Sequence, residues 1–487
     1  METIRVLIYT DLADISDNIG FWGLTDVVRF IKHKWAGVIN FEIDIKNRHF
    51  DYVNNAAGVN GATLLTEPFL GQYHELWVFG FEQANRLNQP LNELILDEIR
   101  VLRAWMQSGG VFITGDHSNP FGKDLGNSKS FLNLGRALGE KIPRAGDLRV
   151  WKGPPTGFYE GDLDKRENFN TQVGSDPCLL DDPIFAFDTN PQTLRLRPPC
   201  SIHRLFWWTY DQDTNSVVPI LKFPDHLHEG KLSTNQSGPD WPKGGAKPKV
   251  VAQGRDKRFP DEQRYYDLVV AFDGDSTGIG RIVADSSFHH YLNVNLLTLT
   301  SRDQNSLPTP GSDLDQIAQY YANLAYWLAP RKIRDKISLG LFFRAASHPA
   351  VIEELGGSII TIGRAALEVL KFEIGIPNLY RILAHCELEE GSREISELIG
   401  SIFLSTVAAG EHALGNAQVV LGYVVREYHA FFEEHGYSNL AWLKHDPVPL
   451  SVIKAGLGKA LTFHTDSLAT LLSGFTAKAS EYYPTSS

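Results

Sequence analysis

The chain has 487 residues, of which 43% are hydrophobic, and its 46 basic and 58 acidic residues give a net charge of −12 with histidine neutral. This length and composition indicate a globular protein of two or three domains. The acidic balance argues against sequence-independent binding of nucleic acid, which requires a basic surface.

Three cysteines, Cys178, Cys200 and Cys386, lie far apart and show no CxxC spacing. This argues against a disulfide framework and against a cysteine zinc site, and favours a reducing compartment. The first residues read as a strand and carry no leader pattern, and no apolar run reaches the ~20 residues of a membrane span. We therefore expect a cytoplasmic protein without a membrane span.

The first 120 residues alternate between strand and helix patterns. Apolar runs predict strands at 4–9, 41–45, 75–81 and 111–114, and helical periodicity predicts helices at 23–32 and 94–106. Strands that alternate with helices form a parallel sheet with helices on both faces. The sequence therefore predicts an α/β fold.

Polar residues follow several of these strands. Asp11 and Glu82 come after the first and third strands, and Asp116, His117 and Ser118 come after the fourth. Ligands of such sheets bind beyond the carboxyl ends of the strands. We expect a site there.

The pattern loosens between about 141 and 260. Residues 232–249 are rich in Pro, Gly, Ser and Lys, which predicts a long exposed loop, either a lid over the site or a surface insertion. Trp207 and Trp208 are interpreted as buried aromatic residues or as the rim of a carbohydrate site.

Regular patterns return with strands at 267–272 and 278–285, followed by a polar segment. That segment contains Asp285, His289, His290 and two asparagines, Asn293 and Asn295, that can cap a helix near Leu296. The Gly-x-Gly at 278–280 precedes a strand, so it is not a dinucleotide fingerprint. A helix over 317–328 then closes the first domain, 1–330, with an apolar stripe made of Tyr320, Tyr321, Leu324 and Trp327.

Residues 331–487 show no strand alternation. Helical stretches run roughly over 349–371, 376–387, 391–435 and 449–480, and small residues such as Gly415 and Gly422 recur in the third. Small residues let helices pack closely, so we expect an all-α bundle domain. Its apolar helices suggest a homo-oligomer or a protein partner.

Three stretches of the first domain resemble the class I glutamine-amidotransferase-like superfamily, and within it the trehalose-utilisation-type (ThuA-like) branch. They are residues 104–117 with their Gly-Gly, strand and Gly-x-His pattern, the Gly-x-Gly-Arg-Ile-Val strand at 278–283, and the closing helix at 319–330. The resemblance implies a flavodoxin-like sheet over residues ~1–330. The helical region resembles no known family.

The resemblance also shows a departure from the amidotransferases. Their nucleophilic cysteine occupies the position of His117, and Asn119 replaces the glycine that follows it there. An imidazole cannot form the acyl intermediate of a thiolate, so glutaminase activity is not expected. ThuA-like relatives carry histidine at this position.

Two hypotheses follow. The first is a ThuA-like hydrolase or lyase acting on a polar small molecule, such as a sugar derivative. Its candidate catalytic residues are His117, Asp116, Ser118, Asp285, His289, His290 and Glu82. Two histidines and a carboxylate from this set, or Asp11, also form a divalent-metal set, whereas no organic cofactor is expected. The second hypothesis is a non-catalytic scaffold whose helical domain mediates oligomerisation or partner docking.

Overall fold

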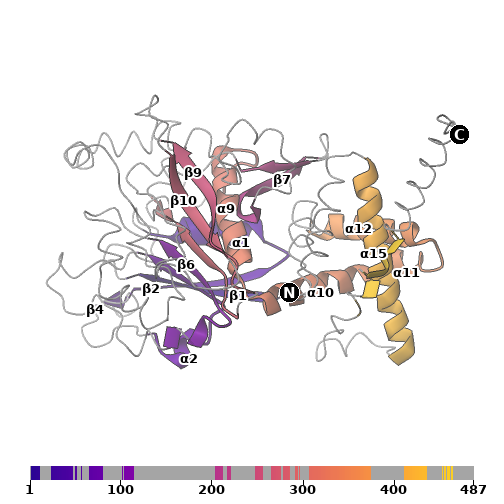
Figure 1. Cartoon of the computed structure of the whole chain (residues 1–487), viewed down its shortest axis with the longest axis horizontal. Helices are drawn as coiled ribbons and strands as arrows, with labels where there is room; N and C mark the ends of the chain where they lie inside the picture. The colour runs from indigo at the N-terminus through magenta and orange to yellow at the C-terminus, as the bar shows by residue number, and fades with distance from the viewer. Residues whose placement is uncertain are drawn as a thin grey trace, which may run out of the picture. The chain divides into compact units, whose positions relative to one another are not determined.

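The computed structural model divides the chain into two compact units. The first, called the α/β unit below, comprises Met1–Thr209 and Val218–Ile333 (Figure 1). The second, called the helical unit, comprises Tyr210–Val217 and Arg334–Ser487. The structure describes residues 2–10, 23–47, 50–51, 56–57, 65–79, 101–102, 104–114, 203–211, 216–220, 247–255, 265–275, 278–285, 291–293, 296, 307–374, 411–435, 452, 455–456, 458–460 and 462–463.

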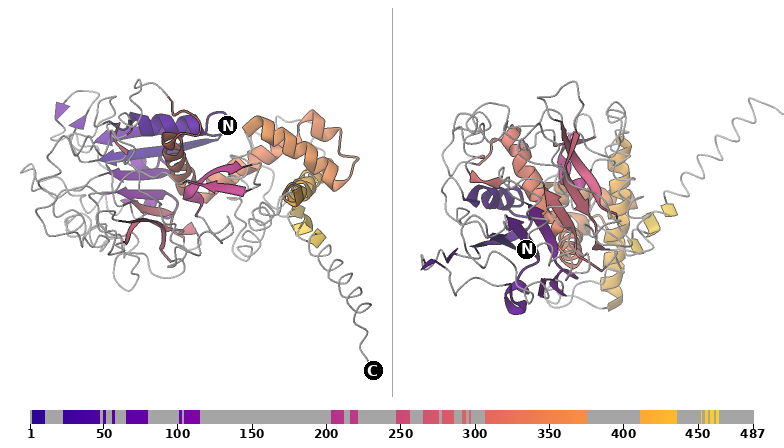
Figure 2. Two further views of the ribbon diagram at one scale, coloured as in Figure 1. Left: turned by 90° about the horizontal axis from the view of Figure 1, so that it is seen from above. Right: turned by 60° about the vertical axis from the view of Figure 1, so that its left-hand side comes forward.

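A twisted sheet organises the first unit. Within the described residues it has seven strands in the order β2-β1-β5-β6-β11-β10-β9 (Figure 2). The strands are β1 (Thr3–Thr10), β2 (Asn40–Asn47), β5 (Glu75–Phe79), β6 (Gly110–Thr114), β9 (Lys249–Arg255), β10 (Tyr265–Phe272) and β11 (Ile282–Asp285). Two short hairpins lie outside the sheet, β3 (Phe50–Asp51) with β4 (Ala56–Ala57), and β7 (Trp207–Asp211) with β8 (Ser216–Pro219). The α/β class is therefore confirmed.

The sheet is mixed, whereas the sequence predicts a parallel one. Strands β2, β1, β5, β6 and β11 are parallel, but β10 runs antiparallel to both β9 and β11. Parallel neighbours need a crossover connection of a dozen or more residues. The short link from Phe272 to Ile282 leaves room only for a reversal of the chain.

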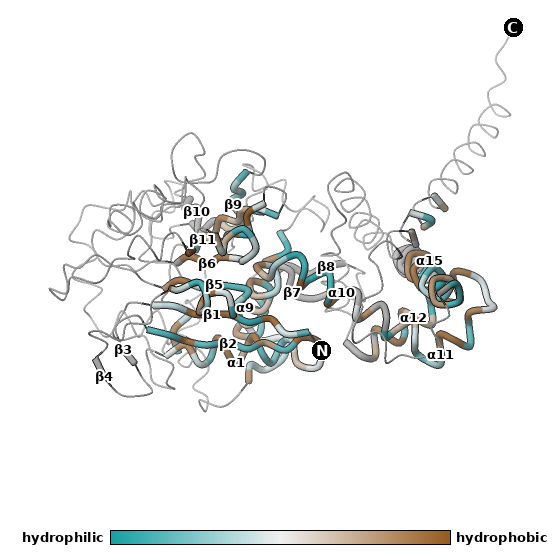
Figure 3. Tube along the Cα trace, turned by 90° about the horizontal axis from the view of Figure 1, so that it is seen from below, coloured by the Kyte–Doolittle hydropathy of each residue, from teal (hydrophilic) through white to brown (hydrophobic). Residues whose placement is uncertain are grey.

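Apolar side chains cover both faces of the sheet. On one face, alternate strand residues such as Leu7, Leu76 and Val111 pack with Leu70 and Met106 in one buried cluster. Leu70 belongs to α2 (Glu67–Leu70), whereas Met106 follows helical residues of the predicted 94–106 helix. Figure 3, coloured by hydropathy, shows hydrophobic (brown) stretches among the strands of the sheet.

Two helices pack together on the opposite face. They are α1 (Thr25–Lys34) and α9 (Asp313–Leu328). The buried Trp35, which ends α1, donates a hydrogen bond from Nε1 to the Ala322 carbonyl (2.9 Å), and its ring lies 4.9 Å from that of Tyr326. Each sheet face therefore has its own layer of helix.

The sequence patterns miss part of the region 141–260. They leave β7 and β9 unassigned, although β9 is an edge strand of the main sheet. Lys249–Arg255 carries glutamine, glycine and arginine among its apolar residues, so its alternation is weak. Most of the predicted loop 232–249 lies outside the described residues, and so do the three cysteines.

The described elements from residue 331 onward are all helical. They are α10 (Arg331–Ala346), α11 (Pro349–Ile352), α12 (Ile359–Ile374) and α15 (Glu411–His435). The single helix predicted over 349–371 is wrong, because residues 353–358 form a turn and Ser358 Oγ accepts the Thr361 N–H at 3.1 Å. A serine in this position caps the start of a new helix.

Glycines bring α12 and α15 into close contact, as the small residues predict. A Cβ on Gly363 would lie 1.6 Å from the Gln418 carbonyl oxygen, and one on Gly422 would lie 2.0 Å from that of Ile359. Only glycine permits this spacing of the two backbones.

Candidate active site at the carboxyl edge of the sheet

The five parallel strands end in one row. The pairing register joins Asn47 of β2 to Thr10 of β1, and Thr10 to Phe79 of β5. Val78 pairs with Ile113, and the last residue of β6, Thr114, pairs with Asp285 of β11. The chain therefore leaves all five strands along the same edge of the sheet.

Most of the predicted site residues follow one of these strands in the sequence. Glu82 follows β5, the Asp116–Ser118 stretch follows β6, and His289 and His290 follow β11. These six residues and Asp11 lie outside the described residues. Asp285 is the one predicted site residue that the structure describes.

Asp285 lies buried under two tyrosine hydroxyls. Its side chain ends β11 with 3% of the residue exposed, and its Oδ2 accepts hydrogen bonds from Tyr291 and from Tyr320, both at 3.0 Å. The two hydroxyl oxygens are 3.4 Å apart. A buried carboxylate needs such donors, because an ionised group without them is costly to remove from water.

Aromatic rings enclose these three polar groups. Tyr291 packs against Phe79 and Phe112 at centroid distances of 5.4 and 5.3 Å, and against Tyr321 at 4.8 Å. Phe206 stacks on Tyr320 at 5.2 Å. The Asp285 carboxylate therefore faces a filled aromatic layer in the described part of the edge.

The environment keeps both tyrosines protonated. Burial, and then the nearby Asp285 carboxylate, raise the pKa of Tyr291 and of Tyr320 well above 10. Both phenols therefore remain protonated, and available as hydrogen-bond donors, at neutral pH. This suits them to hold Asp285 in place, not to exchange protons.

A second connection joins the segment after β11 to the start of α1. Asn293 donates its N–H to the Gly23 carbonyl (2.8 Å), its Oδ1 accepts the Asp26 N–H (2.9 Å), and its Nδ2 donates to Thr25 Oγ1 (2.9 Å). Asn293 therefore caps α1, whereas the sequence suggests that it caps a helix near Leu296. A cap from a distant segment is not detectable in sequence spacing.

The start of α1 is already compensated electrostatically. Asp26 lies in its first turn with 3% of the residue exposed and pairs with Arg29. A helix N-terminus attracts anions through its free N–H groups and dipole. Here an asparagine oxygen and a carboxylate occupy that position, which does not favour a phosphate group at α1.

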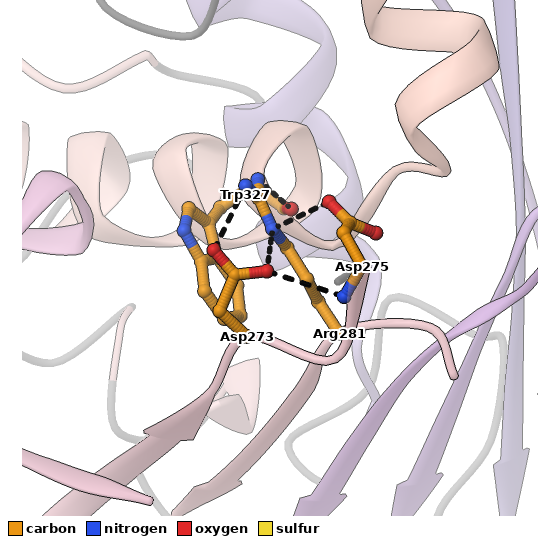
Figure 4. A network of polar contacts seen from close by, with 4 residues as sticks. All are labelled: Asp273, Asp275, Arg281 and Trp327. Carbon is orange, nitrogen blue, oxygen red and sulfur yellow. Dashed lines mark hydrogen bonds and ion pairs between the residues drawn. The ribbon is translucent and has the colours of Figure 1, made fainter. Parts of the chain in front are cut away.

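The Gly-x-Gly-Arg motif at 278–281 lies at the opposite, amino edge of the sheet. It precedes β11, as predicted, and Arg281, with 1% of its side chain exposed, binds two carboxylates (Figure 4). Its Nε lies 3.1 Å from both Asp273 Oδ1 and Asp275 Oδ2, and its Nη1 donates to the Trp327 carbonyl at 3.1 Å. The guanidinium also lies 4.7 Å from the centre of the Trp327 ring. The motif thus ties the β10–β11 turn to the end of α9.

His203 completes this amino-edge cluster. Its ring meets that of Trp327 edge to face at 5.3 Å. Burial, with the positive charges of Arg204, Lys249 and Arg281, lowers the pKa of His203 to about 3. His203 is therefore a neutral packing residue near pH 7. This role is evident only in the structure, because no sequence motif contains His203.

No match to this chain was found among family models, curated proteins or solved structures.

The described residues contain neither a group of metal ligands nor a membrane-spanning helix. None of their His, Cys, Asp and Glu side chains form a group of three or more that could hold a metal ion. Within the same part of the chain, no helix is both long and apolar enough to cross a membrane.

Sequence reasoning missed the role of the tyrosines. Tyr320 and Tyr321 are interpreted from their spacing as apolar residues of the closing helix, yet the Tyr320 hydroxyl holds Asp285. A tyrosine in an otherwise apolar helical stripe, facing a strand that ends in aspartate, is the signal that was available.

Proposed function

We propose that the α/β unit is a ThuA-like hydrolase or lyase that acts on a polar small molecule, such as a sugar derivative, at the carboxyl edge of its sheet. The row formed by the ends of the five parallel strands supports this most directly. These strands end on one side of the sheet, and Asp11, Glu82, His117 and His289 follow β1, β5, β6 and β11 in the sequence.

The strand order supports the flavodoxin-like assignment. Taken in chain order, β1, β2, β5, β6 and β11 lie in the sheet as 2-1-3-4-5, which is the order of flavodoxin-like folds. Ligands of such sheets bind at the carboxyl ends of the first and third strands. Asp11 and Glu82 follow those strands here.

In this proposal His117 acts as the general base, since an imidazole titrates near neutral pH. Asp116, Ser118, Glu82, His289 and His290 bind or orient the substrate. The role of Asp285 is positional, because its carboxylate already accepts two tyrosine hydroxyls in a dry layer. The compensated start of α1 favours a substrate that is not anchored there by phosphate.

The test is turnover of a panel of sugars, sugar lactones and sugar esters, followed by NMR. His117→Asn is expected to lower kcat/KM by about 100-fold or more, the usual contribution of a general base. His33→Asn is the matched control, because His33 is exposed near the end of α1. Equal turnover by His117→Asn and the wild-type protein would remove His117 from the mechanism.

The filled layer around Asp285 favours a second candidate function. Here the α/β unit is a scaffold without catalysis, and the helical unit mediates oligomerisation or partner docking. The observation is that no more than 3% of Asp285 is exposed at the predicted site. Binding of panel compounds without turnover by the wild-type protein supports this candidate, whereas turnover that depends on His117 excludes it.

A further inference from the structure

One ridge of α12 has an unusual composition. Ile360, Arg364, Glu368 and Phe372 follow one another at four-residue spacing, and all four are exposed. Residues at this spacing form a continuous ridge along one side of a helix. The ridge thus has an apolar residue at each end and two opposite charges between them.

The apolar ends are large side chains that remain in water. Ile360 is 41% exposed and Phe372 is 93% exposed. Burying an exposed phenylalanine on association is favourable, because it removes apolar surface from water. The other side of α12 is already used, because Gly363 packs against Gln418 of α15. The exposed ridge therefore lies on a different side of the helix from Gly363.

The order of residues along this ridge is self-complementary. When two copies of α12 are placed antiparallel about a two-fold axis, Ile360 of one copy lies opposite Phe372 of the other. In the same arrangement Arg364 of each copy lies opposite Glu368 of the other. An interface of this isologous kind requires a surface that complements itself, and packing of four-residue ridges is the commonest helix–helix geometry.

We propose that the α12 ridge is a homodimer interface, with a second copy of this chain as its partner. A single pair of helices buries less than the ~1,200 Å² of stable interfaces, so the dimer dissociates on dilution. This ridge would give the helical unit a specific contact surface. It holds whether or not the α/β unit turns over a substrate.

The test is sedimentation velocity of the full chain over a dilution series. The wild-type protein is expected to pass from dimer to monomer on dilution. Phe372→Ser removes the phenylalanine from both Ile360–Phe372 contacts of the two-fold arrangement and is expected to raise the dimer Kd about tenfold or more. Lys336→Glu, an exposed charge reversal on α10, is the matched control and is expected to leave Kd unchanged.

Charge reversal tests the antiparallel register. Arg364→Glu alone and Glu368→Arg alone each place like charges opposite one another, and each is expected to raise Kd about tenfold or more. The double variant Arg364→Glu/Glu368→Arg, and an equimolar mixture of the two single variants, restore opposite charges and are expected to dimerise again.

Three outcomes would overturn the proposal. They are a wild-type protein that stays monomeric at every concentration, an oligomer that Phe372→Ser leaves unchanged, and a double variant that fails to dimerise while it unfolds like the wild-type protein. None of them bears on the catalytic proposal, which is tested by turnover.

Discussion

Asp285 shows how a carboxylate is accommodated at the buried end of a strand. The two hydroxyls of Tyr291 and Tyr320 donate to the same oxygen, and aromatic rings exclude water around them. A hydrogen bond to a charged group contributes ~1.5–3 kcal/mol, and an unsatisfied buried charge costs more. The three residues therefore act as one unit that joins β11, the segment after it and α9.

Tyr320→Phe is expected to lower the free energy of unfolding by about 2 kcal/mol, because it removes one donor from a buried carboxylate. In an Asp285→Asn background the same change is expected to cost less than half of that, since the acceptor is no longer charged. Urea unfolding of the four proteins in this double-mutant cycle measures the coupling. Additive effects would show that the hydroxyl and the carboxylate do not interact.

His203 gives the folded protein a defined sensitivity to acid. Its pKa is lowered from 6.5 to about 3 in the folded state. Between these values the unfolded chain binds a proton at this residue and the folded chain does not. The contribution of His203 to the free energy of unfolding is thus fully present above pH 6.5 and is lost as pH falls towards 3. The loss is at most ~1.4 kcal/mol per pH unit.

His203→Phe keeps a ring against Trp327 and removes the titrating group. Its free energy of unfolding is expected to fall less steeply than that of the wild-type protein between pH 6.5 and pH 4. Urea unfolding at a series of pH values measures the difference between the two slopes, in which the other titrating groups cancel. Parallel curves would mean that His203 titrates alike in both states.

Close backbone contacts fix how several elements meet. At the amino edge of the sheet, a Cβ on Gly280 would lie 1.7 Å from the Gly109 carbonyl oxygen, and Gly280 donates its N–H to the Met106 carbonyl at 2.7 Å. In the helical unit, Gly363 and Gly422 play the same part between α12 and α15. These glycines are needed for the space that they leave free.

Gly363→Ala is therefore expected to destabilise the helical unit by about 3 kcal/mol, because the new methyl group meets backbone that cannot move aside like a side chain. Gly340→Ala is the matched control on α10, where a Cβ meets nothing within 4 Å. That change is expected to stabilise the protein by up to about 1 kcal/mol, since alanine favours helix over glycine. Thermal unfolding followed by circular dichroism compares the two, and equal shifts of the same sign would contradict the close contact.

The elements differ in how well their sequences predict them. Residues 6–9 of β1 and 76–79 of β5 are unbroken apolar runs, and α9 has a clear helical stripe, so local pattern is sufficient for these elements. The strand β9 lies at the edge of the sheet and has a mixed composition, so its pattern is weak. The direction of β10 depends on the length of the link that joins it to β11. The placement of Asp285 beneath Tyr320 depends on residues far apart in the chain, which periodicity does not encode.

At the scale of the whole molecule, each of the two units has its own buried apolar residues. The first unit contains the sheet cluster around Leu76 and Val111, and the second contains buried residues of α12 and α15 such as Leu367 and Leu421. A unit with its own core can unfold as a cooperative block. Variants placed within one core should then act on one block.

Differential scanning calorimetry of the full chain is accordingly expected to show two unfolding transitions. Gly280→Ala is expected to lower the transition of the α/β unit alone, and Gly363→Ala that of the helical unit alone, because each added methyl group meets backbone within one unit. For domains of 150–250 residues, each kcal/mol shifts Tm by roughly 2–4 °C, so a loss of about 3 kcal/mol in the helical unit is resolvable. Gly340→Ala, the control, should move only the helical transition, and upward. A single transition that both destabilising variants shift equally would show that the two units unfold as one.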